Sequence, residues 1–285
     1  MKFNLATPAW ALSLMAAISH ASPVSQLSPR SDTRDLVHSR NWAGLAINTT
    51  TDSPISTLTG VFQLPKYIPN QQANYTNISF ALHLGTNGGC GSSAALGIDM
   101  AILGRDKATF AAWSHSSLDD GNEIAEVHWL DEKRGRRYDI QGGDEITLTI
   151  KTIDHRNLWL QWHNSRTNEF EQLKLWGYNA DLCLKYAAWV TEQRKQFTDG
   201  LSDTAFWSTP DFGRVVLKGM QWATEDFNVW NTGENKGPAK EVWHVIGFKN
   251  DQMDITDTRC SPVVKGDNVN DQGMECLKVG PQEIP

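Results

Sequence analysis

The stretch Gly89 to Asp99, GCGSSAALGID, is the first place to search for catalytic residues, because it sets a cysteine and two serines in a glycine-rich turn before an apolar run. A serine hydrolase of the G-x-S-x-G type holds its nucleophile in a sharp turn that leads from a strand into a helix. Here the turn leads into a strand-like segment. The stretch therefore does not predict a serine nucleophile.

Metal binding is the second chemistry that the residue types allow. Zinc sites on helices need spacings such as H-E-x-x-H, and structural zinc sites need C-x-x-C pairs. No C-x-x-C pair occurs. Neither an H-x-x-x-H nor an H-E-x-x-H spacing occurs among the histidines beyond the N-terminal region, which are His38, His83, His115, His128, His155, His163 and His244. We expect neither a metal nor another cofactor.

Paired carboxylates of the glycosidase kind are the third possibility. Two acids must flank the bond that is broken, and an E-x-D-x-x-E pattern that could place them on one strand is absent. Aromatic residues such as Trp159, Trp162 and Trp176 could stack on sugars, but alternating tryptophans more often pack a core. A glycosidase is therefore not predicted.

Composition and charge narrow the function classes further. The chain has 285 residues, a formal net charge of −7 and a pI of about 5.6, whereas nucleic-acid binders are usually basic. The one basic cluster, EKRGRR from Glu132 to Arg137, lies between strand-like runs and contains a glycine, which favours a solvated hairpin turn. We expect no nucleic-acid partner and no membrane partner.

The N-terminus has the features of an export signal. Residues 1–21 contain one early lysine, an apolar run from Ala9 to Ile18 and small residues at the end, as secretory signal peptides do. Residues 22–40 are polar and resemble a mobile linker or short propeptide. The remainder, 41–285, is long enough for one large domain. We therefore expect a secreted, extracellular and monomeric protein.

Cysteines and sequons agree with an oxidising compartment. Four cysteines allow three pairings, of which we favour Cys260–Cys276 as a local loop and Cys90–Cys183 as a long connection. Asn48, Asn74 and Asn77 lie in N-x-S/T sequons and are candidate glycosylation sites, which would place those segments on the surface.

Alternation of apolar and polar residues dominates the mature sequence. In DEITLTIKTI, Asp144 to Ile153, the apolar side chains fall on one face with a period of two. The next run, LWLQWHN, follows after the four-residue turn 154–157, which predicts a β-hairpin. Many similar runs with turn residues between them predict an all-β sandwich or barrel. The tail from Asp251, which carries the local cysteine pair, is expected to form a terminal hairpin or a strap on the sandwich rather than a second domain.

One segment is ambiguous. Lys185 to Phe197, KYAAWVTEQRKQF, contains good helix formers and neither glycine nor proline, so propensity alone favours a helix. As a strand it would place Ala188, Val190 and Glu192 on one face and Trp189, Thr191 and Gln193 on the other. The residues alone leave both alternatives open.

Seven motifs in order resemble the fungal glutamic peptidases, also called eqolisins or the peptidase A4 family. They are NWAGLAI, GVFQLP, HLGTNGGC, AAW, GGDEITLTI, LCLKYAAWVTEQ and PDFGRVVL, and they span most of Asn41 to Lys218. The resemblance implies a concanavalin A-like β-sandwich of two curved antiparallel sheets with a ligand cleft on the concave face. It also implies the Cys90–Cys183 disulfide and favours a strand for Lys185 to Phe197.

The resemblance also assigns the catalytic positions. Members of the family use a glutamate as general base and acid and a glutamine that holds the oxyanion. The glutamate corresponds to Glu192 in AAWVTEQ, whereas the position of the glutamine corresponds to Ala95 in SSAALGID. Loss of one oxyanion donor costs about 10²–10³-fold in rate. The resemblance therefore predicts an incomplete catalytic pair.

Two other family motifs differ in this chain and add histidines to the cleft. The acid-bearing A-W-Y-E-W stretch becomes AAWSHSS, with His115 after Trp113, and the W-V-G-I-D-G turn becomes HLGTNG, with His83 and Asn87. Three hypotheses follow: an inactive relative, a weak residual endopeptidase, or an enzyme in which Glu192 works with His115 or His83 near neutral pH. The ligand of the cleft would be a polypeptide, a glycan or a small molecule.

Overall fold

The structure is a computed structural model in which sixteen β-strands make up the described part of the chain. It describes residues 36–39, 42–49, 54–66, 75–85, 92–103, 108–117, 128–129, 138–175, 181–193, 212–224, 229–231, 239–249, 255–263 and 273–278. Within these ranges we find no helix that is long and apolar enough to cross a membrane.

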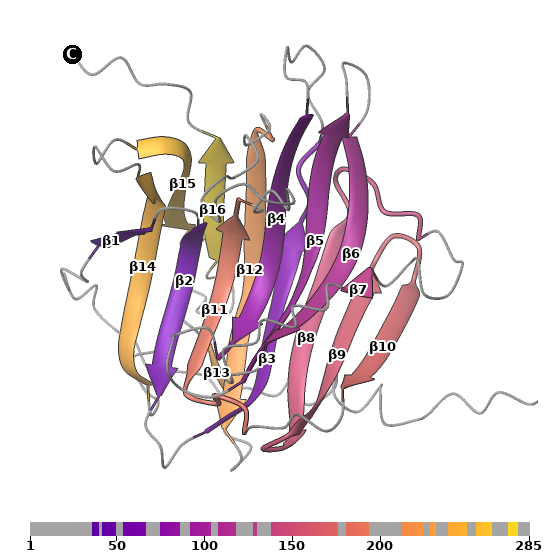
Figure 1. The fold of residues 1–285 in the computed structure, drawn as a ribbon. Helices are drawn as coiled ribbons and strands as arrows, with labels where there is room; N and C mark the ends of the chain where they lie inside the picture. The colour runs from indigo at the N-terminus through magenta and orange to yellow at the C-terminus, as the bar shows by residue number, and fades with distance from the viewer. Residues whose placement is uncertain are drawn as a thin grey trace, which may run out of the picture. The chain divides into compact units, whose positions relative to one another are not determined.

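The strands follow the alternating runs of the sequence (Figure 1). In chain order they are β1 (Leu36–Ser39), β2 (Trp42–Thr49), β3 (Ile55–Gln63), β4 (Tyr75–Leu84), β5 (Ser93–Leu103), β6 (Ala108–Ser117), β7 (His128–Trp129), β8 (Glu145–Asp154), β9 (Asn157–Asn164), β10 (Glu169–Leu175), β11 (Tyr186–Glu192), β12 (Arg214–Thr224), β13 (Val229–Asn231), β14 (Ala239–Lys249), β15 (Ile255–Val263) and β16 (Gly273–Lys278).

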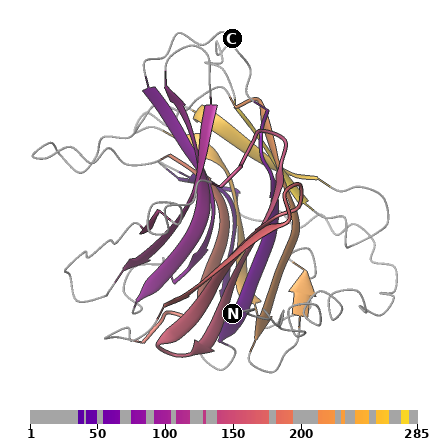
Figure 2. The same cartoon turned by 90° about the vertical axis from the view of Figure 1, so that its right-hand side faces the viewer.

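Hydrogen-bonded pairing joins the strands in the order β10-β9-β8-β3-β12-β16-β15-β14-β2-β11-β4-β5-β6-β7. This ladder folds over at β14, β15 and β16, so that β14, β2, β11, β4, β5, β6 and β7 form one layer and β12, β3, β8, β9 and β10 form the other (Figure 1). The strands of both layers are visibly curved (Figure 2). The predicted all-β sandwich is confirmed.

Among the described residues, the named strands pair antiparallel except β1 and β14, which are parallel, and the isolated bridge between Ser92 and Leu182 is also parallel. The linker expected over 22–40 therefore ends within the ladder, since Leu36–Ser39 pairs with β14. Sequence pattern could not reveal this contact, because an added edge strand is held by backbone hydrogen bonds and needs no apolar alternation.

The core lies between the layers and is built by the period of two. In β9 every second residue is buried, namely Leu158, Leu160, Trp162 and Asn164. From the opposite layer, β4 and β5 contribute Phe80, Leu82, Leu96 and Ile98 to the same cluster. Burying each large apolar side chain contributes about 1.5–3 kcal/mol, so this cluster is the main source of stability.

The ambiguous segment forms a strand, as the resemblance implied. Tyr186–Glu192 is β11, and it pairs with β2 on one side and with β4 on the other. An interior strand of this kind satisfies its backbone donors and acceptors through two neighbours, and tertiary context of this kind overrides helix propensity.

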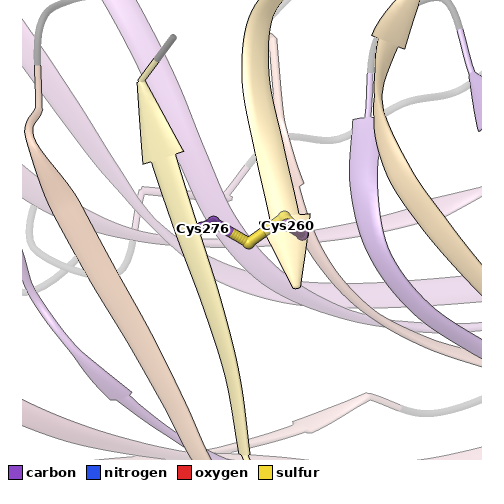
Figure 3. The surroundings of a disulfide bond; sticks show 2 residues. All are labelled: Cys260 and Cys276. Carbon is purple, nitrogen blue, oxygen red and sulfur yellow. A yellow bond between two sulfur atoms is a disulfide. The ribbon is translucent and has the colours of Figure 1, made fainter. Parts of the chain in front are cut away.

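Both predicted hairpins are present. In the first, Asp154 pairs with Asn157, and the Asp154 carboxylate accepts hydrogen bonds from the Arg156 N–H and from Asn157 Nδ2, both at 2.8 Å. In the second, β15 and β16 are antiparallel, and Cys260 lies opposite Cys276 and is joined to it by a disulfide (Figure 3).

Candidate active site

Small residues cover the outer face, opposite the core, of the layer that contains β2, β4, β5 and β11. We call Ala46, Ala81, Ala95 and Ala188 the alanine floor, since each comes from a different strand: β2, β4, β5 and β11. Each of the four is at most 1% exposed and belongs to a second apolar cluster, with Trp113, Tyr186 and Val190. Strand alternation brings them together, because the intervening residues point into the core.

Strand register places the candidate site residues in two rows across this face. In one row, Ala95 lies directly opposite His83 on one side and opposite His115 on the other. In the other row, Ser79 lies between Asp99 of β5 and Glu192 of β11. The two rows are four residues apart along β4, which corresponds to about 13 Å along the strand.

His83 and Glu192 nevertheless meet. Their side chains lean toward each other across this separation, and His83 Nε2 lies 3.3 Å from Glu192 Oε2. The side chains are 16% and 13% exposed, whereas Ala81 and Val190, which lie between the two rows, are 0% and 3% exposed. The arrangement is a partly accessible acid–base pair above a tightly packed apolar surface.

Trp113 packs against the residues around this pair. Its indole lies over Gly97, where a Cβ would come within 2.6 Å of the ring. Its Nε1 donates a 2.9 Å hydrogen bond to Ser79 Oγ, and its ring meets the His83 ring edge-on with centroids 6.4 Å apart. Trp113 therefore supports both rows, one through Ser79 and the other through His83.

Sequence reasoning did not find Ser79, Asp99 or Gly97. Asp99 is 3% exposed and Ser79 is fully buried, so both are part of the packed floor rather than of its open part. The alternation in ISFALHL, which puts Ser79, Ala81 and His83 on one face, was the available signal. Among the described residues, no three His, Cys, Asp or Glu side chains are placed to hold a metal ion.

The remaining predicted positions are partly covered by the structure. Cys260–Cys276 is confirmed. Cys183 is disulfide-bonded, while Cys90, its predicted partner, lies outside the described residues, as do Asn87, Asn74 and the basic cluster 132–137.

Asn77 is only 6% exposed, so the surface position expected for it is wrong, because its strand turns this side chain onto the packed outer face. Asn48 is half-buried on β2.

The family model that matches the chain is the peptidase A4 family, over residues 40–262. A sequence comparison with curated proteins gives no match.

Solved structures with a similar fold include scytalido-glutamic peptidase with a peptide-based transition state analog, at 14% identity and a TM-score of 0.60. Another is SCP-B, a member of the eqolisin family of peptidases, in a complex with the tripeptide Ala-Ile-His, at 13% identity and a TM-score of 0.58. Each alignment covers 84% of this chain and 98% of the other. At these identities the likeness establishes the fold.

Proposed function

Because the chain belongs to the peptidase A4 family, we propose that it is a diverged peptidase that hydrolyses peptide bonds, with Glu192 as its acid–base residue. One observation carries the proposal: the Glu192 carboxylate is partly accessible on the outer face and is held beside an imidazole. The structural neighbours support a peptide ligand, since they were solved with a peptide-based transition state analog and with a tripeptide.

The chemistry assigned to Glu192 is general base followed by general acid. The carboxylate takes a proton from water while the water oxygen bonds to the peptide carbonyl carbon, and it then passes that proton to the amine nitrogen as the C–N bond breaks. Negative charge develops on the carbonyl oxygen in between. Ala95 offers no donor to that oxygen, and one missing donor typically lowers the rate about 10²–10³-fold.

The test is cleavage of a denatured protein by the purified mature chain between about pH 3 and pH 8, a range that brackets carboxyl and imidazole titration. We expect slow cleavage that Glu192→Gln abolishes, because an amide cannot accept the proton. Glu169→Gln on β10 is the matched control and should leave the rate unchanged. Cleavage that persists in Glu192→Gln would contradict the assignment.

A second candidate is binding without catalysis, and Ala95 is the observation that favours it. In that case an uncleaved peptide would bind wild type and Glu192→Gln with equal affinity, and no product would form. For a glycan ligand, Trp113 is 1% exposed and offers no open ring to a sugar, so the partly buried Trp42, which lies opposite Glu192, is the described tryptophan of this face that could contact one.

Export belongs to the same proposal. The N-terminal segment 1–21 and the disulfide between β15 and β16 support a secreted protein. N-terminal sequencing of the protein recovered from culture medium tests this, and gel filtration tests the expected monomer.

A further inference from the structure

Position 95 has no functional group of its own, but both of its cross-strand neighbours are imidazoles. His83 and His115 flank Ala95 in register on the outer face. Ala95 is 1% exposed, so its surroundings are filled and leave little room for a longer side chain. A donor for this site must therefore come from a neighbouring strand.

The two histidines differ in their reach toward Glu192. His83 is on β4, the direct neighbour of β11, and its Nε2 is 3.3 Å from Glu192 Oε2. His115 is on β6, which β4 and β5 separate from β11. With about 4.8 Å between adjacent strands, His115 is roughly 14 Å from β11. Only His83 of the two can act on the same atoms as Glu192.

Among the other described polar groups on this face, Asn77 carries an amide but lies two residues beyond Ser79 on β4, on the side away from His83 and position 95, and the two polar groups nearer the pair are poor substitutes for an amide. Ser79 Oγ is fully buried and accepts the Trp113 hydrogen bond. Asp99 is buried as well, at 3% exposure, and lies in the row of Ser79, four residues along β5 from position 95. An imidazole can donate a hydrogen bond in either protonation state and has two ring nitrogens, so it can face a carboxylate and a substrate together.

We propose that His83 is the second catalytic residue of this site and replaces the amide that position 95 lacks. The proposal rests on the proposed function and specifies its mechanism. As water attacks, Glu192 takes the water proton, and a His83 N–H donates to the carbonyl oxygen and keeps its proton. When the C–N bond breaks, the bonding electrons go to nitrogen, Glu192 protonates that nitrogen, and a carboxylic acid and an amine leave.

The experiment measures kcat and KM for a fluorogenic peptide with wild type, His83→Ala, His83→Gln and the control His163→Ala, which lies on β9 of the other layer. We expect His83→Ala to lower kcat about 10²–10³-fold with a much smaller change in KM, and His163→Ala to keep the wild-type rate. His83→Gln should recover part of kcat, because it restores an amide donor.

The outcomes separate the two proposals. An inactive wild type, or activity that survives Glu192→Gln, overturns the proposed function. Activity that requires Glu192 but is equal in His83→Ala and His163→Ala overturns the role of His83 and leaves the proposed function standing. A circular dichroism melt of each variant confirms that the compared proteins are folded, and His83→Gln, which keeps a polar side chain of similar reach, provides the comparison if His83→Ala is unstable.

Discussion

At the scale of single residues, Gly97 determines how closely Trp113 can approach the alanine floor. The indole occupies the space in which any other residue would carry its Cβ, and the same ring donates to Ser79 and contacts His83. A substitution at position 97 is therefore expected to disturb both Ser79 and His83 through Trp113.

Gly97→Ala should destabilise the protein by about 1–3 kcal/mol, the usual cost of overpacking, because the new methyl group must push the ring away. Urea unfolding measures the loss. Trp113→Phe supplies the control, since a smaller ring relieves the clash: the double variant should be more stable than the sum of the two single effects predicts. Simple additivity would contradict the proposed contact.

At the scale of the elements, a buried carboxylate anchors the hairpin of β8 and β9. Asp144, 4% exposed, accepts hydrogen bonds from Arg166 Nε at 2.6 Å, from Asn164 Nδ2 at 2.8 Å and from the Gln141 N–H at 2.9 Å. Burial acts to raise the pKa of Asp144, but these hydrogen bonds outweigh it and hold the pKa below its ordinary value of 3.8. Because the folded-state pKa is lowered, the carboxylate stabilises the fold above about pH 4, and this contribution is lost as the pH falls through the folded-state value.

Arg166→Met should therefore lower the free energy of unfolding at pH 7 by about 3 kcal/mol, since it leaves a buried charge without its partner. The deficit should shrink below pH 4, where Asp144 is protonated in the unfolded chain and in the variant. Chemical unfolding at several pH values measures this. Arg156→Met, which removes an exposed pair with Asp181, should cost less than about 1 kcal/mol at every pH. Equal losses in both variants would contradict the anchoring role.

At the scale of the whole sandwich, β15 and β16 join the two layers of the ladder, and the Cys260–Cys276 disulfide links these two strands (Figure 3). The bond closes a loop with a sequence separation of 16 residues. By the loop-entropy relation, a closure of this size stabilises the folded protein by about 3 kcal/mol. The layers are therefore held together covalently at the strands that connect them.

Replacing both cysteines by alanine should lower the free energy of unfolding by about 2–4 kcal/mol, measured by thermal or urea unfolding. Leu277→Ala on the same hairpin, at a residue that is 42% exposed, serves as control and should change stability by less than about 1 kcal/mol. A loss in the double cysteine variant no larger than that of the control would show that backbone pairing alone holds the layers together.

The sequence by itself determined the elements. Alternation predicted an all-β sandwich or barrel and the hairpin at 154–157, because period and turn chemistry are local properties, and the family resemblance selected the sandwich. Residue propensity did not decide between a helix and a strand for 185–197, where pairing with two flanking strands outweighs it. The sequence pattern also did not predict that Leu36–Ser39 pairs with β14.

The residues of the candidate site were likewise predictable from the sequence only in part. Motif order pointed to Glu192 and to the missing amide at Ala95, and it named two histidines as candidates without choosing between them. Only the tertiary structure distinguishes the two by placing His83 beside Glu192, because that contact depends on which strand adjoins β11 and on how far side chains from rows four residues apart lean over the alanine floor. Strand order and register are set by long-range pairing, which a pattern read along the chain does not contain.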